Sequence, residues 1–226
     1  MTEPPAAGTL SSLDGFQLAS VPRLVGYMFE GFGVVNAVLR SSPSDALKRA
    51  ALEHGRTLKG RQPESAGLIM SVEAILAKLG VAAPARPTSP DQFREWARAV
   101  EGASPPAGDP VVSLGKVVAG AVLAASLGYL LQSLLAAAPG DPFLGDQLAS
   151  VAETQRRTRI ELDSLGASSA LAEPALSAIP RIEAELDRAP SIETATTSEL
   201  QTLITNLNHL RVELEKALAT GPAART

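Results

Sequence analysis

The stretch VVAGAVLAASLGYLLQSLLAAAPG, residues 117–140, lies between Lys116 and Asp141 and contains no charged side chain. Its length is close to the roughly 20 residues that a helix needs to cross a bilayer. Alanine and leucine, which dominate the stretch, are strong helix formers. The sequence therefore predicts a continuous hydrophobic helix over residues 111–138, shielded from water either by lipid or by the rest of the chain.

The composition of this segment leaves both environments open. Gly120, Ser126, Gly128 and Gln132 weaken it as a membrane span, because each central leucine or valine contributes only about 0.3–0.6 kcal/mol to insertion. On a helical wheel the leucines gather on one side and the small residues, with Gln132, on the other. Small residues allow helices to approach closely in membranes, and they suit a tightly packed soluble core equally well. We keep a buried core helix and a membrane-embedded or membrane-inserting helix as alternatives.

The composition of the whole chain predicts an all-α fold. Hydrophobic residues make up 45% of the 226 residues but aromatic residues only 4%, so the core must consist mainly of Ala, Leu and Val. We see no run of alternating β-branched residues that would indicate a sheet. We expect a helical bundle with a very hydrophobic central helix and a C-terminal three-helix, coiled-coil-like module.

Charge and cysteine content exclude several functions. The net charge of −4 argues against nucleic-acid binding, which needs a concentrated basic surface. The chain has no cysteine, so disulfides, thiol catalysis and thiolate metal sites are excluded. The first residues lack the pattern of a secretory signal peptide, and we expect an intracellular protein, either cytoplasmic or associated with the inner membrane.

Prolines and helix caps divide the chain into four regions. These are an N-terminal helical region (1–80), a Pro-rich linker (81–110) with a short helix at 90–101, the hydrophobic helix (111–138) and the C-terminal module (142–221). We expect Pro22 to break or begin a helix. Ser42 is the expected cap of a following helix that has Pro43 at its first position. Within the C-terminal module, we expect the second helix to be interrupted at Pro174 and to resume at Pro180.

The last helix has the most regular pattern in the chain. Its apolar residues are spaced by three and four over about three heptads. The helix at 142–165 follows the same spacing in part, with Gln155 and Thr158 at seam positions where polar residues usually specify register or partner. We predict that this seam packs within the chain or against a partner. The partner-interface candidates are Leu200, Leu203, Leu207, Leu210, Leu214, Gln155 and Thr158.

Two other surfaces are candidates for binding. Lys48, Arg49, Arg56 and Lys59, extended by Arg61, form the basic face of one helix and could contact anionic headgroups or an acidic partner. In the short helix of the linker, Phe93, Trp96 and Val100 line one face. They form either a docking motif or a cover for the chain's own core.

No residue pattern predicts catalysis, a bound cofactor or a metal site. His54 and His209 lie far apart in sequence, and His54 falls on an apolar stripe typical of a core histidine. Glu30, amid apolar neighbours, is expected at a helix surface rather than as a buried acid.

We therefore predict a non-enzymatic interaction or scaffold protein, a component of a larger assembly contacted through the C-terminal module, with protein partners or self-association. The first alternative is a membrane-anchored or membrane-inserting protein that acts through residues 111–138. A weaker alternative is a regulatory or sensor bundle with a ligand pocket lined by Phe29, Phe32 and Trp96. The sequence leaves any small-molecule ligand unidentified.

Overall fold

The computed structural model describes residues 10–103, 109–166, 173–189 and 191–220. Within these ranges the chain forms eight helices and no strand, as the composition predicts. In chain order the helices are α1 (Ser12–Ser41), α2 (Asp45–Gly60), α3 (Gln62–Lys78), α4 (Pro90–Ala103), α5 (Pro110–Ala137), α6 (Pro142–Gly166), α7 (Glu173–Arg188) and α8 (Thr197–Ala219).

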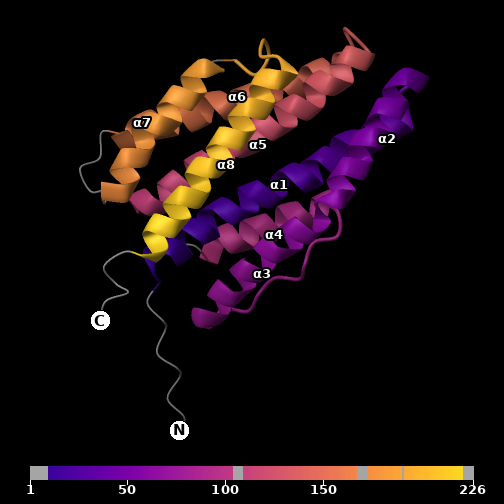
Figure 1. The fold of residues 1–226 in the computed structure, drawn as a ribbon. Coiled ribbons are helices and arrows are strands. Elements are labelled where there is room, and N and C mark those ends of the chain that lie inside the picture. The colour runs from indigo at the N-terminus through magenta and orange to yellow at the C-terminus, as the bar shows by residue number, and fades with distance from the viewer. Residues whose placement is uncertain (1–9, 104–108, 167–172, 190, 221–226) are drawn as a thin grey trace.

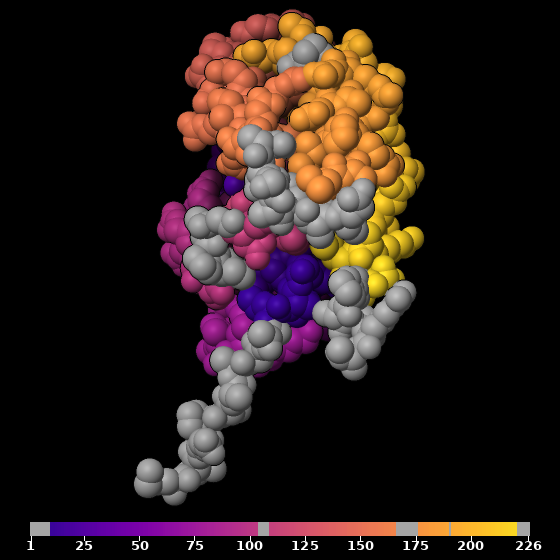
Figure 2. All heavy atoms as spheres, turned by 90° about the vertical axis from the view of Figure 1, so that its left-hand side faces the viewer, coloured from indigo at the N-terminus to yellow at the C-terminus, as the bar shows by residue number. Residues whose placement is uncertain are grey.

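Helices α1 and α5 form the centre of the bundle (Figure 1). They pack along one another more extensively than any other pair of helices. Helices α2, α3 and α4 pack against α1, whereas α6 and α8 pack against α5. Seen from the end where α8 finishes, α6 and α7 cover one side of the molecule and α3 and α4 the opposite side (Figure 2). The two long central helices thus separate an N-terminal layer from a C-terminal layer.

Helix α5 is the predicted hydrophobic helix, and its neighbours in the chain cover it. It is long and apolar enough to cross a membrane, and 72% of its most apolar window is buried inside the bundle. The carboxylate of Asp109 caps its start by accepting hydrogen bonds from the amides of Val111 and Val112. Close contact with α1 depends on Gly115, because a Cβ there would lie 2.9 Å from the carbonyl oxygen of Phe16. The fold therefore supplies an apolar environment for α5 without lipid.

Two expected breaks in helices are wrong. Helix α1 continues through Pro22, and α7 continues through Pro180. A proline inside a helix removes one hydrogen bond and costs about 3 kcal/mol. Its neighbours offset that cost, since Val21 and Val25 beside Pro22 are buried in the core. Pro174 lies in the first turn of α7, where a missing amide proton is harmless.

Local contacts close the ends of several helices. Thr196 and Glu199 form a capping box at the start of α8, and Gly80, with φ of +68°, follows the end of α3. The predicted cap of α2 is wrong, because the cap is Ser44 rather than Ser42. The Ser42 hydroxyl instead accepts a hydrogen bond from the amide of Ser44, and the helix begins two residues after Pro43.

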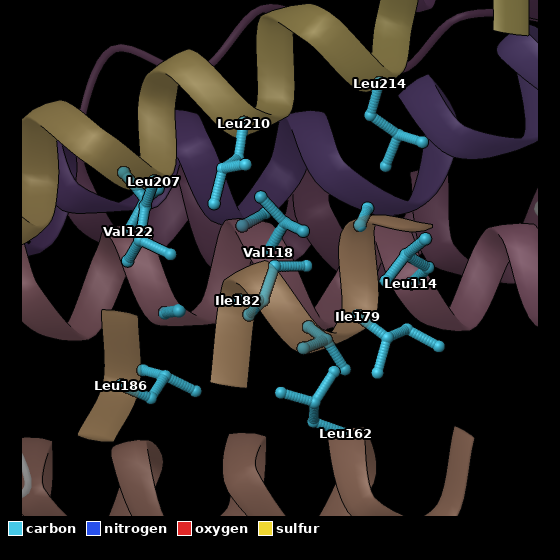
Figure 3. Packing of buried hydrophobic residues seen from close by; sticks show 14 of the residues in the cluster. Leu114, Val118, Val122, Leu162, Ile179, Ile182, Leu186, Leu207, Leu210 and Leu214 are labelled. Atoms are coloured by element: carbon cyan, nitrogen blue, oxygen red, sulfur yellow. The ribbon is translucent and has the colours of Figure 1, made fainter. Parts of the chain in front are cut away.

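Leucines on one side of α8 point into the bundle (Figure 3). Leu207, Leu210 and Leu214 face Val118 and Val122 of α5, together with isoleucines and Leu186 of α7 and Leu162 of α6. All five seam leucines of α8 are at most 6% exposed. The regular leucine pattern is thus buried within this chain.

The connection between α7 and α8 is fixed by two glutamines. The Gln155 side chain donates a hydrogen bond to the carbonyl of Ala189 and accepts one from the amide of Ile192, both at 3.0 Å. Gln132 of α5 donates to the carbonyls of Ile192 and Glu193. The Ile192 side chain fills the space above Gly128. A Cβ added to Gly128 would lie only 2.4 Å from Cγ2 of Ile192.

Candidate binding groove

A groove runs over α1 and α5 between the α2–α3 corner and α8. We name it the α5–α8 groove, and it has a volume of about 260 Å³. Its floor is apolar and is formed by Leu24, Val122, Leu127 and Leu130, whereas its rim carries polar groups from both sides. The rim residues are Tyr27, His54, Thr57, Arg61, Glu64, Ser126, Tyr129, Gln201, Asn208 and Arg211. An apolar floor with a few polar groups is the usual composition of a small-molecule site.

Two buried donors along this groove have no hydrogen-bond partner. They are the Tyr27 hydroxyl and the Arg211 Nε–H, and the described residues contain only four unpartnered buried side-chain atoms of this kind. An unsatisfied buried polar group costs about 1–3 kcal/mol. Such a cost is recovered when a ligand supplies the missing acceptor.

Charges along the groove are mostly paired. Arg61 makes an ion pair with Glu64 at 3.5 Å, and its guanidinium lies over the Tyr27 ring, 5.9 Å from the ring centre. Arg211 is paired with Glu215 at 2.8 Å and is largely buried. Each arginine keeps further N–H groups, because a guanidinium has five. The rim thus offers two cationic donors against the single carboxylate of Glu64.

Burial changes the titration of two ring side chains in the groove. It raises the pKa of Tyr27, an effect that the nearby Arg61 charge partly opposes. Burial also lowers the pKa of His54, whose ring stands edge-on to Tyr129 with ring centres 6.3 Å apart. Near neutral pH, His54 is therefore a neutral imidazole and Tyr27 a neutral phenol, so the positive charge along the groove comes from the arginines.

The seam candidates lie inside the bundle. Leu200, Leu203, Leu207, Leu210 and Leu214 are buried, as are the two polar seam residues. Gln155 bonds the α7–α8 connection, and the Thr158 hydroxyl donates to the carbonyl of Thr154 beside Gly120. In the single chain these side chains hold α6, α7 and α8 against α5.

The residues of the short linker helix are also buried. Phe93, Trp96 and Val100 pack with α1 and α3, and the Phe93 ring stacks on Phe29 with centres 5.0 Å apart. Phe29 and Trp96 therefore belong to a buried core, and the partly buried Phe32 packs against it. The structure brings the three α4 residues together as a cover for the N-terminal layer.

The basic face lies on the outside of α2. Arg49, Arg56 and Lys59 are exposed and Lys48 is half-buried. Arg56 forms a local ion pair with Glu53 at 3.2 Å. Arg61 departs from this face, because it follows the end of α2 and turns toward Tyr27 in the groove.

Sequence reasoning misses most of the groove. The apolar stripe that carries His54 is visible in the sequence, but Tyr27, Tyr129 and Arg211 come from three other helices with no common motif. The sequence contains one signal for the groove. Arg211 stands next to the seam residue Leu210 of the heptad helix, where a charged side chain lies close to the apolar seam. Among the described residues, no group of three or more His, Cys, Asp and Glu lies together as a metal site.

Comparison with known proteins does not indicate a ligand for the groove. No protein family, curated protein or solved structure matches this chain.

Proposed function

We propose that this chain is a non-enzymatic binding protein that takes a small amphipathic anion in the α5–α8 groove. The unpartnered donors of Tyr27 and Arg211 are the observation that supports this proposal most directly. A carboxylate accepts several hydrogen bonds and would occupy such donors, while an attached hydrocarbon would cover the apolar floor. This proposal keeps the sensor alternative from the sequence and moves its pocket to the other side of α1 from Phe29.

The scaffold and membrane alternatives have less support. Assembly through the C-terminal module rests on a leucine seam, and the chain itself covers that seam. A partner would have to contact other faces of α6, α7 or α8. Membrane insertion through α5 would require α1, α6 and α8 to separate from it, which would expose the apolar surface that they bury.

Binding of three eight-carbon probes tests the anion proposal. We expect octanoate to bind by calorimetry and to raise the melting temperature, because a ligand that binds only the folded state stabilises it. Octanol, which lacks the charge, should bind about tenfold more weakly or worse. Octylammonium serves as the probe of opposite charge.

Matched arginine variants locate the effect. Arg211→Met should lower octanoate affinity by about tenfold or more. Arg156→Met is the control, since Arg156 lies exposed on α6 with a local ion pair to Glu153. Equal octanoate affinity in both variants, or equal affinity of the wild type for octanoate and octanol, would contradict the proposal.

A further inference from the structure

A second hollow lies across α5 from the groove, between α1, α4, α5 and α6. We name it the Glu30 pocket, with a volume of about 440 Å³. Its walls include Val34 of α1, Leu123, Leu127 and Leu131 of α5, and Phe143 of α6. A smaller hollow of about 220 Å³ adjoins it, and Glu30, Arg94 and Leu123 line both. Glu30 is therefore a carboxylate at the junction of two hollows, of which the smaller is mainly apolar.

Two glycines of α1 flank Glu30, and one of them, Gly33, faces open space. Gly26, Glu30 and Gly33 are separated by four and three residues, so they lie on one face of the helix. Gly33 lines the larger hollow and Gly26 the smaller. A Cβ at Gly33 would meet only the Pro90 ring, at 3.9 Å. The helix thus presents its carboxylate between two positions without side chains.

Glu30 is not the surface residue that the sequence suggested. It is half-buried, and burial raises the pKa of its carboxyl above the usual range, although the Arg94 charge opposes this. Within the described residues, Glu30 forms no ion pair and no hydrogen bond through its side chain.

The arginines near Glu30 form their hydrogen bonds and ion pairs with other groups. The Arg94 guanidinium is bonded to Asp91 at 2.7 Å, and Arg23 donates to the carbonyl of Lys116 at 2.8 Å. Arg23 also pairs with Glu161 at 3.6 Å. Arg98 and Glu101 line only the smaller hollow. Glu30 is thus the charge in the larger pocket that lacks a direct partner.

We infer that the Glu30 pocket binds an organic cation, an ammonium group attached to an apolar chain, with Glu30 as the counter-charge. The ammonium group would donate to the carboxylate, and such charge-assisted bonds are among the strongest in proteins. Gln147 and Ser150 of α6 line the same pocket and offer further acceptors. The hydrocarbon would lie along the α5 leucines and Phe143. This inference is independent of the anion proposal, because the two hollows share Leu127 but no charged residue.

Octylammonium is the test ligand, with octanol and octanoate as the neutral and anionic probes. We expect octylammonium to bind wild-type protein at least about tenfold more tightly than octanol in this pocket. Amide chemical shifts should change at Phe143 and Ser150. Glu30→Gln should remove the preference for octylammonium while leaving octanoate binding unchanged.

Two control variants separate the possible results. Glu53→Gln changes an exposed acid on α2 and should leave octylammonium affinity unchanged. Arg211→Met, the variant that tests the anion proposal, should also leave octylammonium affinity unchanged. Failure of the anion proposal and failure of this inference would therefore give different results. If octanol binds as tightly as octylammonium, or if Glu30→Gln and Glu53→Gln lose affinity equally, the inference is wrong. Shift changes confined to α2 or α8 would also overturn it.

Discussion

The two faces of α5 are packed in different ways. On the face of small residues, Ala121 and Ala125 are buried, Ile192 fills the space above Gly128, and Gln132 bonds the α7–α8 connection. On the face of large residues, leucines line both hollows, and Leu123 remains half-buried. Small side chains let neighbouring helices come close, as at Gly128. The leucines of the other face line the two hollows, and the larger hollow opens beside Gly33 of α1.

A buried charge on the small-residue face should have the largest effect. Ala125→Asp places a carboxylate at a fully buried position with no partner, and we expect a loss of more than about 4 kcal/mol and failure to fold. Leu123→Asp, on the other face, should be milder because that side chain lines a pocket. Urea denaturation followed by circular dichroism measures both. Equal losses would show that the two faces do not differ in packing.

A methyl group at the closest contact should have the next largest effect. Gly128→Ala brings a Cβ against Ile192, and we expect destabilisation by about 1–3 kcal/mol. Gly67→Ala in α3 is the matched control, since nothing lies within 4 Å of its Cβ. The control should gain up to about 1 kcal/mol from higher helix propensity. Stabilisation of both variants in the same denaturation experiment would refute close packing at Gly128.

Removal of an unpartnered hydroxyl in the groove should stabilise the free protein. Tyr27→Phe eliminates a buried donor that has no acceptor, with an expected gain of about 1 kcal/mol. The same change should weaken octanoate binding. Thermal denaturation with and without octanoate distinguishes the two effects. A stabilised variant with unchanged octanoate affinity would mean that Tyr27 has no part in binding.

The smallest effect should be a change in pH dependence. Burial raises the folded-state pKa of Glu30, so the folded protein holds its proton more tightly than the unfolded chain does. Below the unfolded pKa both states are protonated, and the stabilising contribution is fully present. It is lost as the pH rises through the folded pKa.

Glu30→Gln abolishes this titration. The stability advantage of the variant over wild type should therefore be small at acid pH and grow as the pH rises toward neutral. Denaturation midpoints at a series of pH values measure this difference. A difference that stays constant across the series would show that Glu30 is as well solvated when folded as when unfolded.

Structural features that depend only on residues close together in the sequence could be predicted. The uncharged run indicates α5, and Thr196 with Glu199 indicates the start of α8, because length, propensity and capping act within one or two turns. The continuity of α1 through Pro22 could not be predicted in this way. It depends on burial of residues that contact the helix from distant parts of the chain.

Neither hollow could be predicted for the same reason. The α5–α8 groove combines side chains from α1, α2, α3, α5 and α8, and no spacing in the sequence indicates that Tyr27 and Arg211 share it. For Glu30 the sequence shows an acid amid apolar residues. Whether that acid lies at a surface or beside a cavity depends on how α4 packs on α1 and how α6 packs on α5.

The connection between α7 and α8 has a consequence for altering the length of the chain. Loops between helices usually tolerate inserted residues because they lie at the surface. Here the Ile192 side chain fills the space above Gly128 of α5. Gln132 and Gln155 form hydrogen bonds with the backbone on either side of Ile192. One added residue between Ala189 and Glu193 would move apart two backbone groups that a single glutamine side chain now binds together. A tag or a fused protein therefore belongs elsewhere, for example at the turn around Gly140, where a Cβ would meet no other atom within 4 Å.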